Sequence, residues 1–236
     1  MDKYIYHRMI GAILTLSTVS VYLLSCLMAM SKELPTHPEL KIFDDLGPRY
    51  NTVWGMVFLI MYLIMALMCD ISVIRNREHD VPPHIRSFRF KIFHEVVFPQ
   101  VSGIIAFWPV FFYDRELVFP KVVDIIISPV GNFVFHGLGI VYVLWELVFL
   151  PRDVPKRSDV KRTKLLGLNT IFTIVLLYTK YVDLGVWMYE VLTATEGTIL
   201  FPIIFFGIAI MSNIAYSAQW YVKDYVWSLR STCKDD

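Results

Sequence analysis

Six long runs without Asp, Glu, Lys or Arg dominate the pattern of this 236-residue chain, and nearly all of its charge lies between them. A transmembrane helix needs about 20 mostly apolar residues to cross a hydrocarbon core of roughly 30 Å. The shorter runs reach that length by including interfacial polar residues. The pattern therefore predicts an all-α polytopic membrane protein, with residues 1–236 forming a single integral-membrane domain. The six transmembrane helices are expected near 9–30, 52–74, 92–113, 125–150, 165–190 and 197–222.

Composition and charge refine this prediction. Hydrophobic residues make up 56% of the chain and the mean hydropathy is +0.54, well above the soluble average. The net charge of +1 gives no indication of nucleic acid as a partner. With six spans, sixteen Lys and Arg residues fall on the side that holds both termini and five on the other. The positive-inside rule then predicts cytoplasmic termini. It does not distinguish the endoplasmic reticulum from the plasma membrane.

The fourth span has an irregular start. The segment Ser128-Pro129-Val130-Gly131-Asn132 combines a helix-stopping proline, a glycine and an asparagine of the type that caps helices. We expect residues 122–131 to lie at the interface and the regular helix to begin near Asn132. Such a break would free backbone N–H groups that suit a developing anion. The alternative is that Pro129 occupies the first helical turn, where it is harmless.

His136 is the only histidine well inside a span, roughly 6 Å below the expected helix start at about 1.5 Å per residue. Asn132 precedes it by four residues and can orient the imidazole. Thr52 opens the second span in the same half of the membrane. A hydroxyl beside a histidine is the minimum for nucleophilic acyl chemistry. The alternatives are a structural histidine and a threonine that only caps its helix.

Other polar residues in the spans have mainly structural interpretations. Lys180 and Asp183 are three residues apart on the fifth span and are expected to pair. Alternatively, Lys180 binds the carboxylate of a substrate. A second set, in the half of the membrane nearer the termini, is expected to form hydrogen bonds between helices. This set is Glu95, Gln100, Glu146, Asn169 and Asn213.

Metal and cofactor chemistry have little support in the sequence. The six histidines form no HxxH pair, so no metal site is predicted. The chain also lacks a GxSxG elbow, a phosphate loop and a dinucleotide fingerprint, so no cofactor is predicted.

A set of motifs distributed along the chain resembles the androgen-induced protein family. The most specific are Tyr113-Asp114-Arg115-Glu116 and Phe119-Pro120-Lys121, followed by Asn132, His136 and Glu146. The resemblance extends from about residue 52 to residue 227. It implies a multi-pass threonine hydrolase that acts on fatty acid esters of hydroxy fatty acids.

The resemblance also implies a catalytic pair, which maps to Thr52 and His136. The chain departs from the family pattern at Phe133, where a second histidine is expected, so Phe133 is interpreted as a packing or pocket-lining residue. The implied partners are a lipid substrate and membrane lipids, with Asn132 and Lys180 as substrate-binding candidates. Protein partners are not indicated.

Two other classes of function remain open. One is a non-enzymatic membrane protein that binds a lipid or a regulatory partner. The other is a small transporter. The absence of an internal repeat and of an evident buried chain of charges in the sequence argues against this class.

Overall fold

The computed structural model describes residues 4–150 and 157–232, with side chains described up to Ser228. Within these ranges the chain is helical and contains no strand. Six helical segments are long and apolar enough to span a membrane. They are Ile5–Glu33, Asn51–Ile74, Pro83–Tyr113, Pro129–Phe149, Thr163–Asp183 and Leu200–Ser228. The predicted all-α membrane architecture is confirmed, whereas the orientation of the termini remains a prediction.

Three spans are single helices for most of their length, and three are composite. The single ones are α1 (Ile5–Glu33), α3 (Asn51–Ile74) and α10 (Leu200–Thr232). The third span joins α4 (Pro83–Ile92) to α5 (Val101–Tyr113) through a π-helical turn at Phe93–Val97. The fourth joins α6 (Pro129–His136) to α7 (Leu138–Phe149). The fifth is α8 (Thr163–Tyr178) with a π-helical turn at Thr179–Asp183.

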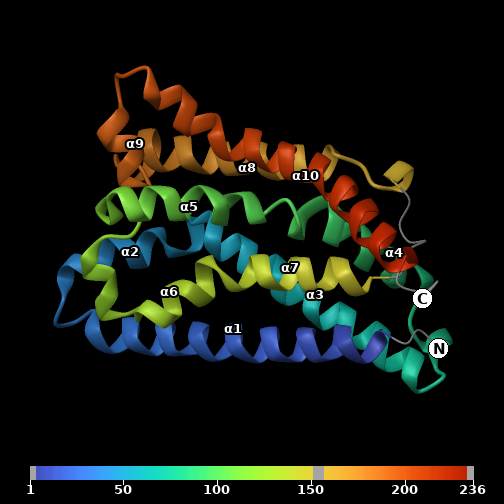
Figure 1. Cartoon of the computed structure of the whole chain (residues 1–236). Helices are drawn as coiled ribbons and strands as arrows, with labels where there is room; N and C mark the ends of the chain where they lie inside the picture. The colour runs from blue at the N-terminus through green and yellow to red at the C-terminus, as the bar shows by residue number, and fades with distance from the viewer. Residues whose placement is uncertain (1–3, 151–156, 233–236) are drawn as a thin grey trace.

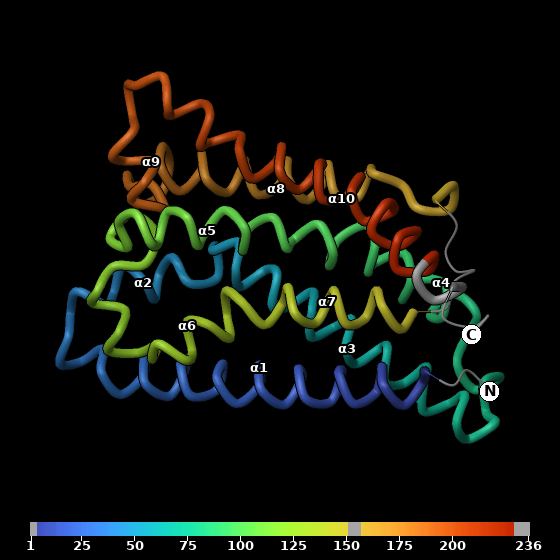
Figure 2. The backbone as a smooth tube through the Cα atoms, viewed as in Figure 1, coloured from blue at the N-terminus to red at the C-terminus, as the bar shows by residue number. Residues whose placement is uncertain are grey.

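The spans form an elongated bundle in which α1 lies along one side and α8 with α10 along the other (Figure 1). Helices α3, α5 and α7 lie between them, so that α1 packs against α3 and α7 while α10 packs against α5. The start of α1 and the end of α10 lie at the same end of the bundle (Figure 2). The opposite end carries two short helices, α2 (Lys41–Leu46) and α9 (Glu190–Thr195).

Some helix boundaries differ from the sequence prediction. The third span begins at Pro83 rather than near 92, because the basic segment before the apolar run continues the helix. The fourth begins at Pro129, because the Ser128 hydroxyl accepts a hydrogen bond from the Gly131 N–H at 3.1 Å. The prediction of a start near Asn132 is therefore wrong, and Pro129 occupies the first turn. The fifth span ends at Asp183 rather than near 190.

A charged cluster is buried at the end of the bundle nearer the termini. The Arg89 guanidinium donates to both carboxylate oxygens of Asp70, at 2.7 and 3.2 Å, and to Glu146 at 3.3 Å. Arg8 donates to the same Asp70 carboxylate at 3.1 and 3.2 Å. The Tyr62 hydroxyl donates to Glu146 at 2.5 Å. Two cations and two carboxylates balance, and the cluster ties α1, α3, α4 and α7 together.

Arg8 and Arg89 lie outside the predicted spans, so the sequence did not indicate that their charges are buried. The predicted interhelical hydrogen bonds are confirmed for Glu146 and for Asn169, which donates from α8 to Ser212 of α10 at 2.9 Å. The prediction is wrong for Asn213, which donates to the Ala209 carbonyl of its own helix at 2.8 Å.

Candidate active site

Thr52 and His136 meet at the contact between α3 and α6. The Thr52 Oγ1 atom lies 3.1 Å from His136 Nε2, although the residues are 84 positions apart in the chain. Thr52 is the second residue of α3, and His136 is the last residue of α6. The structure thus brings together the hydroxyl and the imidazole that the sequence singled out. Both side chains are half-buried.

Thr52 does not cap its helix. The capping position of α3 is Tyr50, whose backbone is extended (φ −63°, ψ 135°) and whose side chain makes no capping hydrogen bond. Thr52 lies inside the first turn, and its hydroxyl is directed at the imidazole across the helix interface. The capping interpretation of this threonine is therefore wrong.

The first-turn amides of α3 differ in how they are hydrogen-bonded. The Asn51 N–H donates to the Tyr189 hydroxyl at 3.1 Å, and the amides of Val53 and Trp54 donate to the carbonyl of the capping residue. Within the described part of the chain, the Thr52 N–H has no hydrogen-bond acceptor. This free amide lies at the positive end of a 24-residue helix, directly beside the Thr52 side chain.

Asn132 sets the orientation of the histidine. Its Oδ1 atom lies 2.8 Å from His136 Nδ1, and its backbone carbonyl oxygen lies 3.3 Å from the same nitrogen. Both partners are acceptors, so Nδ1 carries the ring proton and Nε2 presents a lone pair to the Thr52 hydroxyl. The predicted orienting role of Asn132 thus has a direct geometric basis. Asn132 is only 5% exposed, and its carbonyl oxygen is occupied by the histidine.

Aromatic side chains fix the imidazole on its other sides. The Phe107 ring stacks on His136 with a centroid separation of 3.8 Å and an interplanar angle of 10°. Phe119 approaches edge-on at 6.3 Å. The Trp108 indole N–H donates to the His136 carbonyl at 2.6 Å. This carbonyl has no partner within the helix because α6 ends here, so the indole satisfies a partly buried acceptor.

Gly137 permits the break between α6 and α7. A Cβ atom at this position would lie 2.7 Å from the Phe133 carbonyl oxygen and 2.9 Å from the Phe133 ring. Any larger residue would therefore move the chain directly after His136. Phe133 itself is 54% exposed, with its ring 6.5 Å from that of Trp108. Of its two predicted roles, packing is the one that these contacts support.

Lys180 and Asp183 do not pair with each other, so that prediction is wrong. Asp183 forms an ion pair with Arg49, which precedes α3. Lys180 Nζ lies 3.4 Å from Glu196 and 5.6 Å from the centroid of the Trp187 ring. The π-helical turn at Thr179–Asp183 changes the angular spacing of these side chains, which explains why a rule for regular helices failed.

Two uncharged tyrosine side chains pack against each other in the loops beside the site. Tyr50 and Tyr189 contact each other edge to face at 5.5 Å. Burial raises the pKa of both hydroxyls, that of Tyr189 to about 12. Both phenols therefore stay protonated near neutral pH. Among the described residues, no group of three or more His, Cys, Asp or Glu side chains could hold a metal ion.

Comparison with known proteins identifies the family. The model of the family described as FAR-17a/AIG1-like protein matches residues 10–220. The chain belongs to this family. The match covers all six spanning segments, at least in part, and includes both Thr52 and His136. The family resemblance inferred from the motifs is therefore confirmed.

Curated relatives cover most of the chain at moderate identity. The androgen-dependent TFPI-regulating protein of Mesocricetus auratus is 27% identical over 192 residues, which are 80% of this chain and 81% of the relative. The human androgen-dependent TFPI-regulating protein is 31% identical over 148 residues, 61% of this chain and 63% of the relative. The human androgen-induced gene 1 protein is 27% identical over 201 residues, with coverages of 80% and 81%. No solved structure matches the chain.

Proposed function

We propose that this protein is a membrane-embedded lipid ester hydrolase in which Thr52 is the nucleophile and His136 the general base. The observation that carries the proposal is the 3.1 Å contact between Thr52 Oγ1 and His136 Nε2. A hydrogen bond of that length lets the base accept the hydroxyl proton as the oxygen attacks. Asn132 completes the arrangement by holding the histidine in the required tautomer.

The reaction proceeds in two half-reactions. Thr52 Oγ1 attacks the ester carbonyl carbon while its proton passes to His136 Nε2. The bond to the alcohol oxygen then breaks, and His136 returns the proton to this leaving group, so that an acyl-threonine remains. Water attacks the acyl carbon and gives a proton to His136, which passes it to the departing Thr52 oxygen. The products are a carboxylic acid and an alcohol.

The oxyanion of each tetrahedral intermediate needs a hydrogen-bond donor. The backbone N–H of Thr52 is suited to this role, because it is adjacent to the nucleophile and has no other acceptor among the described residues. The dipole of α3 adds a fixed partial positive charge at this point. Such preorganised donors contribute about 3–4 kcal/mol to catalysis in well-studied hydrolases.

The substrate class in this proposal is the fatty acid ester of a hydroxy fatty acid. The aromatic surroundings of His136 favour an apolar acyl group. Such an ester also carries a free carboxylate, for which Lys180 is the candidate cation at the same end of the bundle. Its present partner, Glu196, is 43% exposed at the side chain and can be displaced by a competing carboxylate. The Asn132 Nδ2 group, which has no acceptor among the described residues, is a second candidate contact to the substrate.

A second candidate function is regulation without catalysis, through binding of a lipid or a protein partner. It is favoured by the names of several relatives, which describe androgen-dependent regulation of TFPI. Under this alternative the contact between Thr52 and His136 would be structural. Ester hydrolysis by the purified protein distinguishes the two.

The proposal is tested by comparing wild type with Thr52→Ala, His136→Ala and the double variant, each purified with its membrane lipids. We expect each single variant to lose at least about 99% of the hydrolysis of a fatty acid ester of a hydroxy fatty acid, since general base catalysis alone contributes about 10²- to 10⁴-fold. The double variant should be little worse than either one, because the residues act as a unit. Thr52→Ser is the matched control and should retain measurable activity. Full activity in a folded Thr52→Ala protein would exclude Thr52 as the nucleophile and favour the regulatory alternative.

A further inference from the structure

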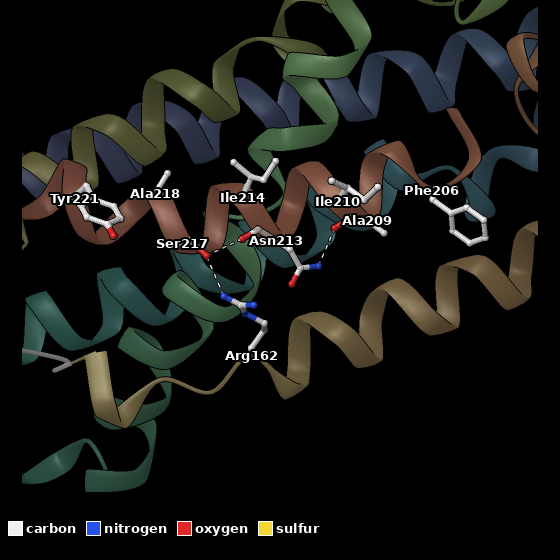
Figure 3. A pocket seen from close by; sticks show the side chains of 9 residues that line it. All are labelled: Arg162, Phe206, Ala209, Ile210, Asn213, Ile214, Ser217, Ala218 and Tyr221. Carbon is white, nitrogen blue, oxygen red and sulfur yellow. Dashed lines mark hydrogen bonds between the residues drawn. The ribbon is translucent and has the colours of Figure 1, made fainter. Parts of the chain in front are cut away.

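A groove on the outer face of α10 lies apart from the Thr52–His136 site, at the side of the bundle formed by α8 and α10 (Figure 3). Its volume is about 930 Å³, within the range of sites that hold small molecules. Most of its lining is apolar and comes from a single face of α10. The lining residues on this helix are Phe206, Ala209, Ile210, Asn213, Ile214, Ser217, Ala218 and Tyr221.

Small side chains create the groove. The short side chains of Ala209 and Ala218 project little from the helix, whereas the rings of Phe206 and Tyr221 lie at the two ends of the groove (Figure 3). The stretch from Phe206 to Tyr221 rises roughly 22 Å along the helix axis. One leaflet of the hydrocarbon core is about 15 Å thick, so the groove can accommodate a lipid acyl chain along its length.

The groove is cationic beside Ser217, about one helical turn from its Tyr221 end. Arg162 directly precedes α8, and its Nη2 atom donates to the Ser217 hydroxyl at 2.9 Å (Figure 3). Its guanidinium also lies 5.1 Å from the centroid of the Tyr216 ring. Among the described residues, no carboxylate forms an ion pair with Arg162. The nearby Lys164, by contrast, is paired with the buried Glu95.

The position of this charge matches the interface of the membrane. Arg162 precedes the fifth span, which begins at Thr163, while the remainder of the groove follows the sixth span into the apolar region. Basic side chains between transmembrane helices at such an interface bind anionic lipid headgroups. A guanidinium is suited to phosphate because it presents several N–H donors in one plane.

We propose that the groove binds one anionic membrane phospholipid, with an acyl chain along α10 and the headgroup phosphate on Arg162. The site requires no contact with the Thr52–His136 pair, so it is independent of the proposed hydrolase activity. The bound lipid would complete the outer surface between α8 and α10, where α10 is the least buried of the spanning helices.

The test is native mass spectrometry of the full-length protein, extracted from bilayers of equal parts dioleoylphosphatidylserine and dioleoylphosphatidylcholine. We expect the wild type to retain one phosphatidylserine in preference to phosphatidylcholine. Arg162→Gln should reduce that preference about five-fold, the value of one basic residue near an anionic lipid surface. The matched control is Lys161→Gln, which removes the adjacent exposed charge but leaves the lining of the groove intact. Ala209→Phe should reduce retention of both lipids, because the ring fills the groove.

Three results would overturn the proposal. Equal effects of Arg162→Gln and Lys161→Gln would mean that the charges attract anionic lipid without a site. Unchanged retention in a folded Ala209→Phe variant would show that no acyl chain occupies the groove. A dimer that Ala209→Phe dissociates would instead assign this face to a second copy of the chain.

Discussion

The Oδ1 atom of Asn132 lies 2.8 Å from Nδ1 of His136, one helical turn away on α6. This contact determines that the opposite ring nitrogen, Nε2, faces Thr52 with its lone pair. The chemistry proposed for the threonine therefore depends on a second polar side chain. Asn132 orients the imidazole, and His136 Nε2 is the base for Thr52.

Replacement of Asn132 tests this dependence. Asn132→Ala should lower kcat for ester hydrolysis by about 10- to 100-fold, the usual cost of losing a partner that orients a histidine. An accompanying rise in KM would support the proposed contact between the Asn132 Nδ2 group and the substrate. Asn132→Asp retains an acceptor for Nδ1 and should restore much of the rate, with a shifted pH profile because the new carboxylate stabilises the imidazolium. If Asn132→Asp and Asn132→Ala are equally impaired with identical pH profiles, the orienting role is incorrect.

A methyl group at Gly137 should disrupt the same site from the backbone. Gly137→Ala places Cβ 2.7 Å from the Phe133 carbonyl, so we expect a loss of roughly 1–3 kcal/mol of stability and a clear loss of activity. Gly167→Ala in α8 is the matched control, because nothing lies within 4 Å of its added Cβ. That variant should be neutral or more stable by about 0.5–1 kcal/mol. Thermal unfolding and hydrolysis assays on both variants check the difference, and equal behaviour would contradict the structural argument.

The buried charged cluster should govern stability rather than chemistry. Arg89→Leu leaves Asp70 and Glu146 without a shared cation. The free energy of unfolding should therefore fall by about 3 kcal/mol or more. Arg86→Leu is the control, since the Arg86 side chain is 37% exposed and lies 3.6 Å from the exposed Glu78. Melting temperatures in detergent measure both effects. A melting temperature for Arg89→Leu as high as that of the control would show that the cluster contributes nothing.

Lys180 provides a test of substrate recognition. Lys180→Gln should raise KM for an ester with a free carboxylate more than for its methyl ester, by about ten-fold, if the ammonium binds that carboxylate. Glu196→Gln removes only the competing partner of Lys180 and should leave KM unchanged or lower it. Equal KM changes for the acid and its methyl ester would show that Lys180 does not bind the substrate carboxylate.

The spans could be predicted from sequence because their cause is local. Uninterrupted apolar length is sufficient for a membrane helix, and the predicted segments agree with the observed ones apart from their ends. The ends differ where a polar segment continues the helix, as in Pro83–Ile92. They also differ where a side chain caps the helix, as Ser128 does. These outcomes depend on contacts that hydropathy does not encode.

The site was predictable only in part. Thr52 and His136 were identifiable as a hydroxyl and an imidazole at similar membrane depth, together with the family motifs. The roles of Phe107 and Trp108 were not, because aromatic residues within an apolar run carry no sign of which ring will stack on a histidine. The pairing of Asp183 with Arg49 depended on tertiary packing and on a π-helical turn, neither of which side-chain spacing can indicate.

The most direct test of the central claim is the position of a covalent adduct. Wild-type protein in membranes is treated with an alkyl fluorophosphonate, and the modified peptide is identified by tandem mass spectrometry. We predict a single adduct on Thr52, absent from Thr52→Ala and strongly reduced in His136→Ala, with Thr170→Ala in α8 labelled like wild type. An adduct elsewhere, or a labelled and fully active Thr52→Ala protein, would contradict the assignment of Thr52 as the nucleophile.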